Sequence, residues 1–298
     1  MHHKEASFLT QPSAVDLHPP AEIARRMEQL GVTKCSLPPH RRILLSIAAG
    51  AFIALGCIAY QVALAGWQGS YGAGQILGGL VFNLGLALVA LAGAELFTGN
   101  TLIVMAFAGR KISLGQMAAN WAAVWLGNAA GALLIALLAY GAQVWAGGGN
   151  LVGLKALGIG AAKAALPFGV AFARGILANI LVTLAVWVYS GRRTAADKIA
   201  AMVLPITAFV AMGGEHSVAN LFFLPYALML KATPAVASTP GAPADLLPHL
   251  TLLGTGRNLA ASTLGNLVGG AVCVGLFYWF AFRWRETDGA GGAGHRAA

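Results

Sequence analysis

The chain has 298 residues, of which 58% are hydrophobic and only 10% are charged, and its formal net charge is +9. Its mean hydropathy of +0.72 excludes an ordinary soluble domain of this length and predicts an integral membrane protein.

Residues 1–41 are polar and do not read as a cleaved signal peptide, because the first apolar run begins at Ile43. Within this segment, "PPAEIARRMEQLGV" begins with prolines and spaces its apolar residues as an amphipathic helix does. We predict that 1–41 forms a cytoplasmic segment whose short helix lies on the membrane face, where it either gates or tethers.

The chain carries no charged residue over 43–94 or over 112–154. Each run is long enough for two crossings, or for one crossing and a long loop, at about 20 residues per helix. The apolar pattern predicts a channel domain over 42–285 and a disordered Gly/Ala-rich tail over 286–298. We predict six transmembrane helices within the channel domain, at 43–64, 76–108, 112–139, 166–189, 199–230 and 258–282.

Charge placement predicts the orientation of these spans, since Lys and Arg accumulate on the cytoplasmic side of a membrane. With both ends inside, only a few of the 19 basic residues fall on the outside or within a span. The outside set is Lys155, Lys163, Lys231 and Arg257, and Arg174 lies within a span. We predict a multi-pass protein with cytoplasmic N- and C-termini, whose positive charge needs no nucleic acid to explain it.

The second and fifth predicted spans are interrupted by polar stretches, "AELFTGN" and "GEHSVAN", each with a Glu and an Asn five residues apart. Interrupted helices within a membrane are tolerated where they line a cavity or are buried in protein, and two in matching positions are typical of an inverted repeat. The third and sixth spans also match, through "LGNAAG" and "LGNLVG", and both contain GxxxG. We predict an all-α membrane protein with an inverted 3+3 repeat.

The polar stretches supply the candidate site. Glu95 and Glu215 are placed to accept hydrogen bonds from the N–H groups that the breaks free, so we predict that they are structural loop clamps. His216 is the one histidine within the predicted spans, where an ionisable residue indicates function. The small hydrogen-bonding groups predicted beside it at mid-membrane are Thr98, Asn100 and Asn220.

Two basic residues, Lys163 and Arg174, flank these groups and indicate a small anion as the cargo. Arg174 cannot easily reach water from within a span, so we expect it to be paired or to face a cavity, with Glu215 as one acceptor. A neutral-solute channel of aquaporin type would carry NPA-like motifs at the breaks, which this chain lacks. No nucleophile or metal-ligand set accompanies the carboxylates, so the sequence predicts no enzyme, no metal and no cofactor.

Four stretches, "AGAELFTGN", "FARGILANILVTLAVW", "DKIAAMVLPITAFVAMGGEHSVAN" and "STLGNLVGG", resemble the formate/nitrite transporter family in sequence, order and spacing. Formate channels are the most similar branch. The resemblance implies a homopentamer in a bacterial inner membrane, in which each aquaporin-like protomer has its own pore for formate, nitrite or hydrosulfide and contacts lipid. Protons are then the second partner, because a protonated His216 would donate one so that the neutral acid crosses.

The resemblance also assigns residues. It places the pore threonine at Thr98, the central histidine at His216 and the vestibule lysine at Lys163. Asn179 matches an asparagine near the pathway. The apolar constrictions fall on Phe82, Leu86, Phe97 and Phe209. The family usually has an aromatic residue where this chain has Gly214, and we expect a more flexible loop or a locally wider pore there.

Overall fold

The computed structural model describes residues 17–284, and in this part of the chain every regular element is a helix. The first sixteen residues of the predicted N-terminal segment and the predicted tail, 286–298, lie outside the described residues. In chain order the helices are α1 (Pro20–Cys35), α2 (Pro39–Ala63), α3 (Tyr71–Ala92), α4 (Phe97–Asn100), η1 (Thr101–Ile103), α5 (Val104–Ala108), α6 (Leu114–Gly141), η2 (Val144–Ala146), α7 (Leu151–Ala165), α8 (Phe168–Ser190), α9 (Ala195–Ala211), α10 (Ser217–Lys231), α11 (Pro234–Ala237), η3 (Leu247–His249), α12 (Leu252–Leu267), η4 (Val268–Leu276) and α13 (Phe277–Phe282).

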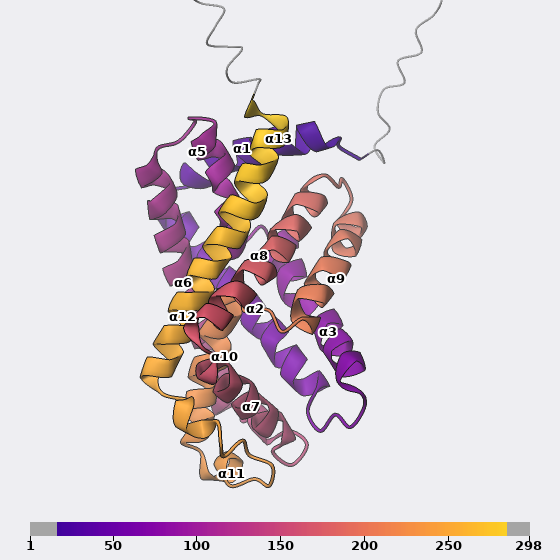
Figure 1. The fold of residues 1–298 in the computed structure, drawn as a ribbon, viewed down its shortest axis with the longest axis vertical. Helices are drawn as coiled ribbons and strands as arrows, with labels where there is room; N and C mark the ends of the chain where they lie inside the picture. Colours follow the sequence, from indigo (N-terminus) through magenta and orange to yellow (C-terminus); the bar gives the residue numbers. More distant parts are fainter. Residues whose placement is uncertain (1–16, 285–298) are drawn as a thin grey trace, which may run out of the picture.

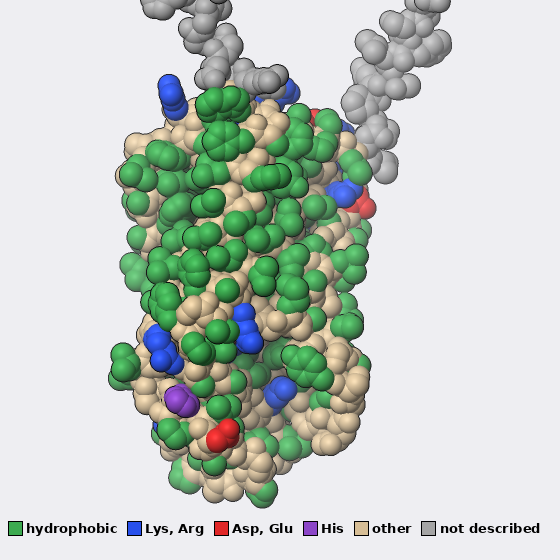
Figure 2. Space-filling model, in the orientation of Figure 1, with side chains coloured by type: hydrophobic (Ala, Val, Ile, Leu, Met, Phe, Trp, Pro, Cys, Tyr) green, Lys and Arg blue, Asp and Glu red, His purple; other side chains and the backbone are tan. Residues whose placement is uncertain are grey.

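Five helical stretches are long and apolar enough to cross a membrane. They are Pro39–Ala63, Tyr71–Ala92, Leu114–Gly141, Phe168–Ser190 and the continuous stretch Leu252–Phe282. Apolar side chains cover the middle of the molecule in Figure 2, where water would make them costly and lipid would not. The protein is therefore a multi-pass helical membrane protein.

The second and fifth predicted spans are each broken, as the sequence indicates. α3 ends before the polar stretch, and the shorter apolar stretch Phe97–Ala108 follows it. α9 ends at Ala211, and α10 begins again at Ser217. Both chain segments therefore pass through three non-helical residues, 94–96 and 214–216, between two helices, and the rest of each polar stretch is helical.

Two bundles of similar construction make up the fold. α2 packs against α3 and α6, while α8 packs against α9 and α12. α3 also contacts α9, and α6 contacts α10, so each bundle packs against a broken helix of the other. Figure 1 shows α1, α5, α13 and the connection from α8 to α9 at one end, which we call the terminal face. α7 and α11 lie at the opposite end, the distal face.

The glycines of the two GxxxG motifs sit at these helix contacts. A Cβ at Gly131 would strike the backbone carbonyl of Ile47 in α2. A Cβ at Gly269 would strike the carbonyl of Ile176 in α8. These glycines therefore let the helices approach closely, which accounts for the extensive α2–α6 and α8–α12 contacts.

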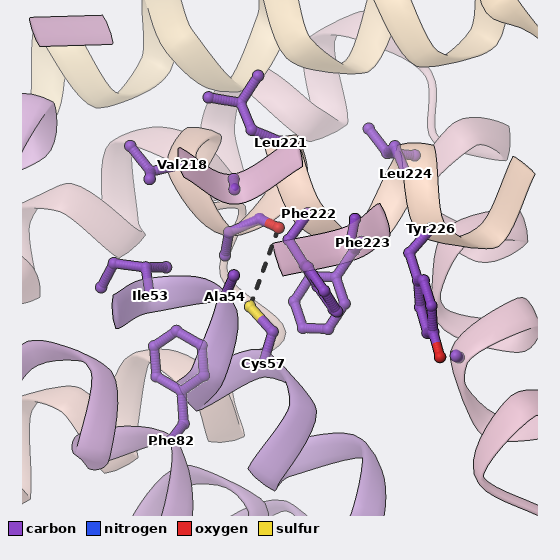
Figure 3. Close-up of a cluster of buried hydrophobic side chains, with 14 of the residues drawn as sticks. Ile53, Ala54, Cys57, Phe82, Val218, Leu221, Phe222, Phe223, Leu224 and Tyr226 are labelled. Carbon is purple, nitrogen blue, oxygen red and sulfur yellow. Dashed lines mark hydrogen bonds between the residues drawn. The ribbon is translucent and has the colours of Figure 1, made fainter. Parts of the chain in front are cut away.

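The core between the bundles is apolar. Figure 3 shows Ile53, Ala54 and Cys57 of α2 facing Val218 and Phe222 of α10. The Cys57 thiol lies 4.0 Å from the carbonyl oxygen of Ala219, a contact that links α2 to the first turn of α10. This packing holds the start of α10 at the centre of the molecule.

The sequence analysis missed α7, which lies before the fourth span. Its fifteen residues, "LVGLKALGIGAAKAA", are too few to cross a membrane, and they stand between the third and fourth predicted spans. α7 packs along α10 and α12. The structure has an α-helix, α1, within the predicted N-terminal segment, and it occupies the terminal face (Figure 1), while its place on a membrane stays a prediction.

Candidate functional site

The first break is held open by an asparagine from α6. Gly93 ends α3 in the left-handed conformation, with φ +70°, which suits a residue without a Cβ. Asn128 then binds both sides of the break. Its Oδ1 accepts from the Phe97 N–H at 2.9 Å, and its Nδ2 donates to the carbonyls of Glu95 at 2.9 Å and Ser46 at 2.7 Å.

The second break repeats this geometry with an asparagine from α12. Gly213 has φ +67°. Asn266 Oδ1 accepts from the Ser217 N–H at 2.8 Å, and its Nδ2 donates to the carbonyls of Glu215 and Gly175, both at 2.8 Å. The two asparagines are the third residues of "LGNAAG" and "LGNLVG". The matched motifs therefore serve to satisfy backbone groups that the breaks would otherwise leave unpaired.

The two glutamates point away from the broken backbone, into side-chain networks. Glu95 accepts from Lys34 Nζ at 2.7 Å through Oε1 and from Asn100 Nδ2 at 2.7 Å through Oε2. Asn100 Nδ2 also donates to Asn120 Oδ1 at 3.0 Å, and Lys34 Nζ donates to Asn100 Oδ1 at 2.9 Å. We call these four residues the terminal network.

The distal network has the same composition. Glu215 Oε1 accepts from Lys163 Nζ at 2.8 Å, and its Oε2 accepts from Asn220 Nδ2 at 2.7 Å and from Asn258 Nδ2 at 3.0 Å. Asn220 Nδ2 also donates to Asn258 Oδ1 at 2.8 Å. Both carboxylates are nearly fully buried, and a buried charge is stable when it is paired and hydrogen-bonded in this way.

These contacts change the reason for a clamping role. The sequence analysis expected Glu95 and Glu215 to accept from freed backbone N–H groups. In the structure Asn128 and Asn266 do so, because an amide side chain carries both a donor and an acceptor and can bind backbone groups on both sides of a break. The side chains of the glutamates instead hold a lysine and an asparagine. Arg174, expected as a partner of Glu215, contributes only its backbone carbonyl, which accepts from the Glu215 N–H at 3.3 Å.

Thr98 and His216 meet at the centre. Thr98 Oγ1 lies 2.9 Å from His216 Nε2, and both residues are buried. His216 Nδ1 accepts from the Ala219 N–H at 3.1 Å and so caps the N-terminus of α10. A ring nitrogen that accepts carries no proton, so the Nδ1 contact assigns the proton of a neutral ring to Nε2, from where it is donated to Thr98.

A cavity opens on each side of this pair. The distal cavity, of about 220 Å³, is lined by Phe82, Lys163, Arg174, Phe209, Glu215 and His216 among others. The terminal cavity, of about 390 Å³, is lined by Lys34, Leu86, Glu95, Leu96 and Asn100 among others. Each cavity therefore joins one lysine–glutamate pair to one broken helix, and His216 lines the distal cavity.

The predicted constriction residues divide between the cavities. Phe82 and Phe209 line the distal cavity with their rings edge to face, 5.6 Å apart at an angle of 80°. Phe209 also lies 5.8 Å from the His216 ring. Leu86 lines the terminal cavity together with Leu96, which the sequence analysis did not single out.

Phe97 lines neither of these cavities and is buried in the core. Asn179 is also fully buried, and its Nδ2 donates to the carbonyls of Thr98 at 3.3 Å and Asn266 at 2.6 Å. In this structure Asn179 therefore holds the backbone of the first break, and its predicted place along the pathway stays a prediction. Asn100 and Asn220 belong to the two networks.

Lys34 is the residue that sequence reasoning missed. It sits near the end of α1, among the cytoplasmic basic residues that topology explains, so its charge carried no separate signal. The signal that would have found it is the internal repeat. Lys34 and Lys163 both lie in the last turn of a helix that precedes a span, and the matching Glu–Asn stretches require matching lysines.

Gly214 lines the distal cavity, but its missing side chain does not widen it. A Cβ at this position would lie 2.9 Å from both Ala178 Cβ and the Phe209 carbonyl oxygen, so it would point into packed protein. The glycine is therefore a requirement of local packing, which differs from the expected wider pore.

Two broken helices, their polar junction and a cavity on either side of it define a helical membrane protein of the channel type. The chain belongs to the formate/nitrite transporter family, whose model matches residues 21–280. It is 39% identical over 277 residues to the formate channel FocA of Escherichia coli (strain K12), covering 92% of this chain and 97% of that protein. It is 32% identical over 280 residues to the formate channel BtFdhC of Bacillus thuringiensis, covering 91% and 98%.

Solved structures agree with this family. A pentameric formate channel with formate bound superimposes with a TM-score of 0.76 at 37% identity, covering 82% of this chain and 97% of that one. A second channel of the same family gives a TM-score of 0.73 at 32% identity, covering 87% and 98%.

Proposed function

We propose that this protein is a formate channel, through which the substrate crosses by way of the Thr98–His216 pair. The observation that carries the proposal is the hydrogen bond between these residues, placed between two cavities that each present a lysine. The lysines raise the local concentration of an anion, and the apolar rings beyond them exclude its hydration shell. The names of the relatives support formate among small monovalent anions.

The fold supports six spans in an inverted 3+3 arrangement. α2, α3 and α6 would form the first half, and α8, α9 and α12 the second, with the short helices of the breaks completing the broken spans. The terminal face carries the connections rich in Lys and Arg, so we place it in the bacterial cytoplasm. The pentameric solved relative supports a homopentamer in which each protomer has its own pore.

The proposed proton donor is His216. Desolvation makes an anion unfavourable beside the buried Thr98–His216 pair. Transfer of one proton from a protonated imidazole to the anion would produce two neutral species. The geometry sets a condition for this step. A protonated ring carries hydrogen on both nitrogens, so Nδ1 would have to release the Ala219 N–H, and the first turn of α10 would lose its cap.

The test uses His216→Asn, because Asn is a preferred N-cap residue but does not titrate. In proteoliposomes, we expect formate uptake by the wild type to rise as the outside pH falls. The variant should lose this pH dependence and at least about tenfold of its rate. An unchanged pH dependence would exclude the proton role. Nitrite and hydrosulfide, measured side by side with formate, identify the preferred anion, and equal passage of all three would contradict a formate channel.

His216→Ala is the matched control, since it removes the ring and the cap together. A lower melting temperature for this variant than for His216→Asn would separate the cap from the transport role. Osmotic swelling with a neutral solute tests the alternative of an aquaporin-type pore.

A further inference from the structure

Arg174 is a charged residue of the distal cavity that the networks do not use. It lies in the second turn of α8, its side chain is exposed, and it lines the cavity with Lys163 and His216. Its guanidinium faces the Gly213–Gly214 turn, since a Cβ at Gly213 would lie 3.9 Å from Nη1. Neither glycine presents a side chain to it, so the guanidinium borders open space.

The charge of Arg174 is not neutralised by the charged groups around it. Within residues 17–284, its side chain makes no ion pair or hydrogen bond. Glu215 is the carboxylate of this cavity, and Lys163, Asn220 and Asn258 occupy its two oxygens. The charges of Lys163 and Glu215 cancel, so Arg174 gives the described lining of the cavity a net charge of one positive unit.

The repeat indicates that the fold does not need this arginine. Its counterpart in the first half is Leu45, whose carbonyl accepts from the Glu95 N–H at 3.2 Å as that of Arg174 does from Glu215 at 3.3 Å. Leu45 also lines the other cavity. The structural task of the position belongs to the backbone, and an apolar side chain fulfils it equally well.

We infer that Arg174 forms an anion-binding site in the distal cavity, specific for small planar anions with two oxygens, ahead of Lys163 and His216 on the pathway. The guanidinium presents two parallel N–H groups that match a carboxylate or nitrite, whereas an ammonium acts as a point charge. A halide or hydrosulfide has a single acceptor atom, so it can accept only one linear N–H hydrogen bond from the guanidinium. The site therefore favours two-oxygen anions before the apolar rings are reached. This inference rests on the proposed function.

The test compares Arg174→Gln, which removes the charge, with Arg174→Lys, which keeps the charge and loses the fork. In proteoliposomes with the distal face outward, we expect Arg174→Gln to raise the half-saturating formate concentration about tenfold and Arg174→Lys about threefold, with hydrosulfide uptake equal in Arg174→Lys and wild type. Half-saturating concentrations equal to wild type in both variants would overturn the inference. No formate uptake by the wild type would instead contradict the proposed function.

A binding measurement keeps the inference testable in that case. Phenylglyoxal modifies accessible arginines, and peptide mass spectrometry reads the extent at Arg174 in the full-length protein. Formate and nitrite should slow its modification at least about threefold relative to chloride at equal ionic strength. Equal modification in formate and chloride would overturn the inference. Arg110, an exposed arginine that lines neither of these cavities, serves as the internal reference.

Discussion

The terminal and distal networks have the same composition and share the lysine–glutamate, asparagine–glutamate and asparagine–asparagine hydrogen bonds, but they differ in how their lysines are held. Lys163 comes from α7, which is packed along α10 and α12, and its side chain is 15% exposed. Lys34 comes from α1 on the terminal face, and its side chain is 27% exposed. One repeated bonding pattern is therefore built once inside the molecule and once at its edge, and the enclosed copy should contribute more to stability.

α1 is held against the rest of the molecule by apolar packing on η1, α5 and α8 and, in addition, by a buried charge. Glu28 is fully buried and pairs with Lys111 Nζ at 3.1 Å and with Arg283 Nη2 at 3.0 Å. These partners come from the loop before α6 and from the end of α13. The position of Lys34 thus depends on these ion pairs as well as on the packing of α1, whereas that of Lys163 depends on the packing of α7.

The charge beside each network also differs. Arg174 lies one helical turn closer to the break than its nearest equivalent, because Arg41 precedes Leu45 by four residues in α2. The second cation of the distal cavity, Arg174, therefore lies closer to the break, and that of the terminal cavity, Arg41, lies farther from it. Networks of the same composition with different flanking cations make the two sides of the pathway chemically distinct.

The largest expected effect comes from removing a network charge. Glu215→Gln leaves the ammonium of Lys163 with no carboxylate in a nearly closed site, and we expect a loss of about 3 kcal/mol in the free energy of unfolding. Glu95→Gln should cost about 1 kcal/mol, since Lys34 reaches water more easily. Melting temperatures of the two purified variants in detergent measure the difference.

Lys163→Met and Lys34→Met are the matched controls, because they remove the other member of each pair. Each should leave a carboxylate without its lysine and lower the melting temperature of the protein. The decrease should be larger for Lys163→Met than for Lys34→Met. If Glu95→Gln were as destabilising as Glu215→Gln, exposure of the lysine would not set the strength of the pair.

Much of this site was predictable from the sequence, since a polar residue in an apolar run has few structural explanations. Thr98 and His216, predicted on that ground, form a direct hydrogen bond. The partners were less predictable. Asn128 and Asn266 stood in recognised motifs, but their role depends on which backbone groups lie opposite them across the bundle. Lys34 was hidden because positive charge on a cytoplasmic segment already had a topological explanation.

The helices that supply Asn128 and Asn266 give a second contrast. α6 is a regular α-helix, whereas its counterpart is interrupted by the π-helical stretch η4. Counting from Asn128 and Asn266, Ala132 corresponds to Gly270. A Cβ fits at Ala132, but at Gly270 it would overlap Thr101 Oγ1 and Asn179 Nδ2. The glycine lets η4 approach the residues that hold the first break.

Gly270→Ala should therefore lower the free energy of unfolding by about 2 kcal/mol, as overpacking does, although Ala has the higher helix propensity. Ala132→Gly, the reverse change, should cost about 1 kcal/mol from helix propensity and the lost methyl contacts. Melting temperatures of the two variants compare them. A stabilised Gly270→Ala protein would mean that η4 can move away from Thr101.

The smallest effect is expected at the exposed side of α1. The hydrogen bond from His18 lowers the pKa of the Glu22 carboxyl, with Arg26 adding to it and desolvation opposing it. His18 Nδ1 lies 2.9 Å and Arg26 Nε 3.2 Å from Glu22 Oε1. Because the folded-state pKa is the lower one, the ionised carboxyl stabilises the fold above its unfolded pKa of about 4.3, and this contribution disappears as the pH falls through the folded value.

Glu22→Gln should accordingly lower the melting temperature at pH 7 by no more than about 1 °C, since exposed pairs contribute little. The difference from wild type should shrink as the pH falls below about 4.3 and should vanish below the lowered folded-state pKa, where both side chains are neutral. Melting curves between pH 7 and pH 3 measure both points, with Glu95→Gln recorded alongside. If Glu22→Gln were as damaging as Glu95→Gln, α1 would be held by its exposed side chains, and the burial of Glu28 would not explain how the terminal lysine is positioned.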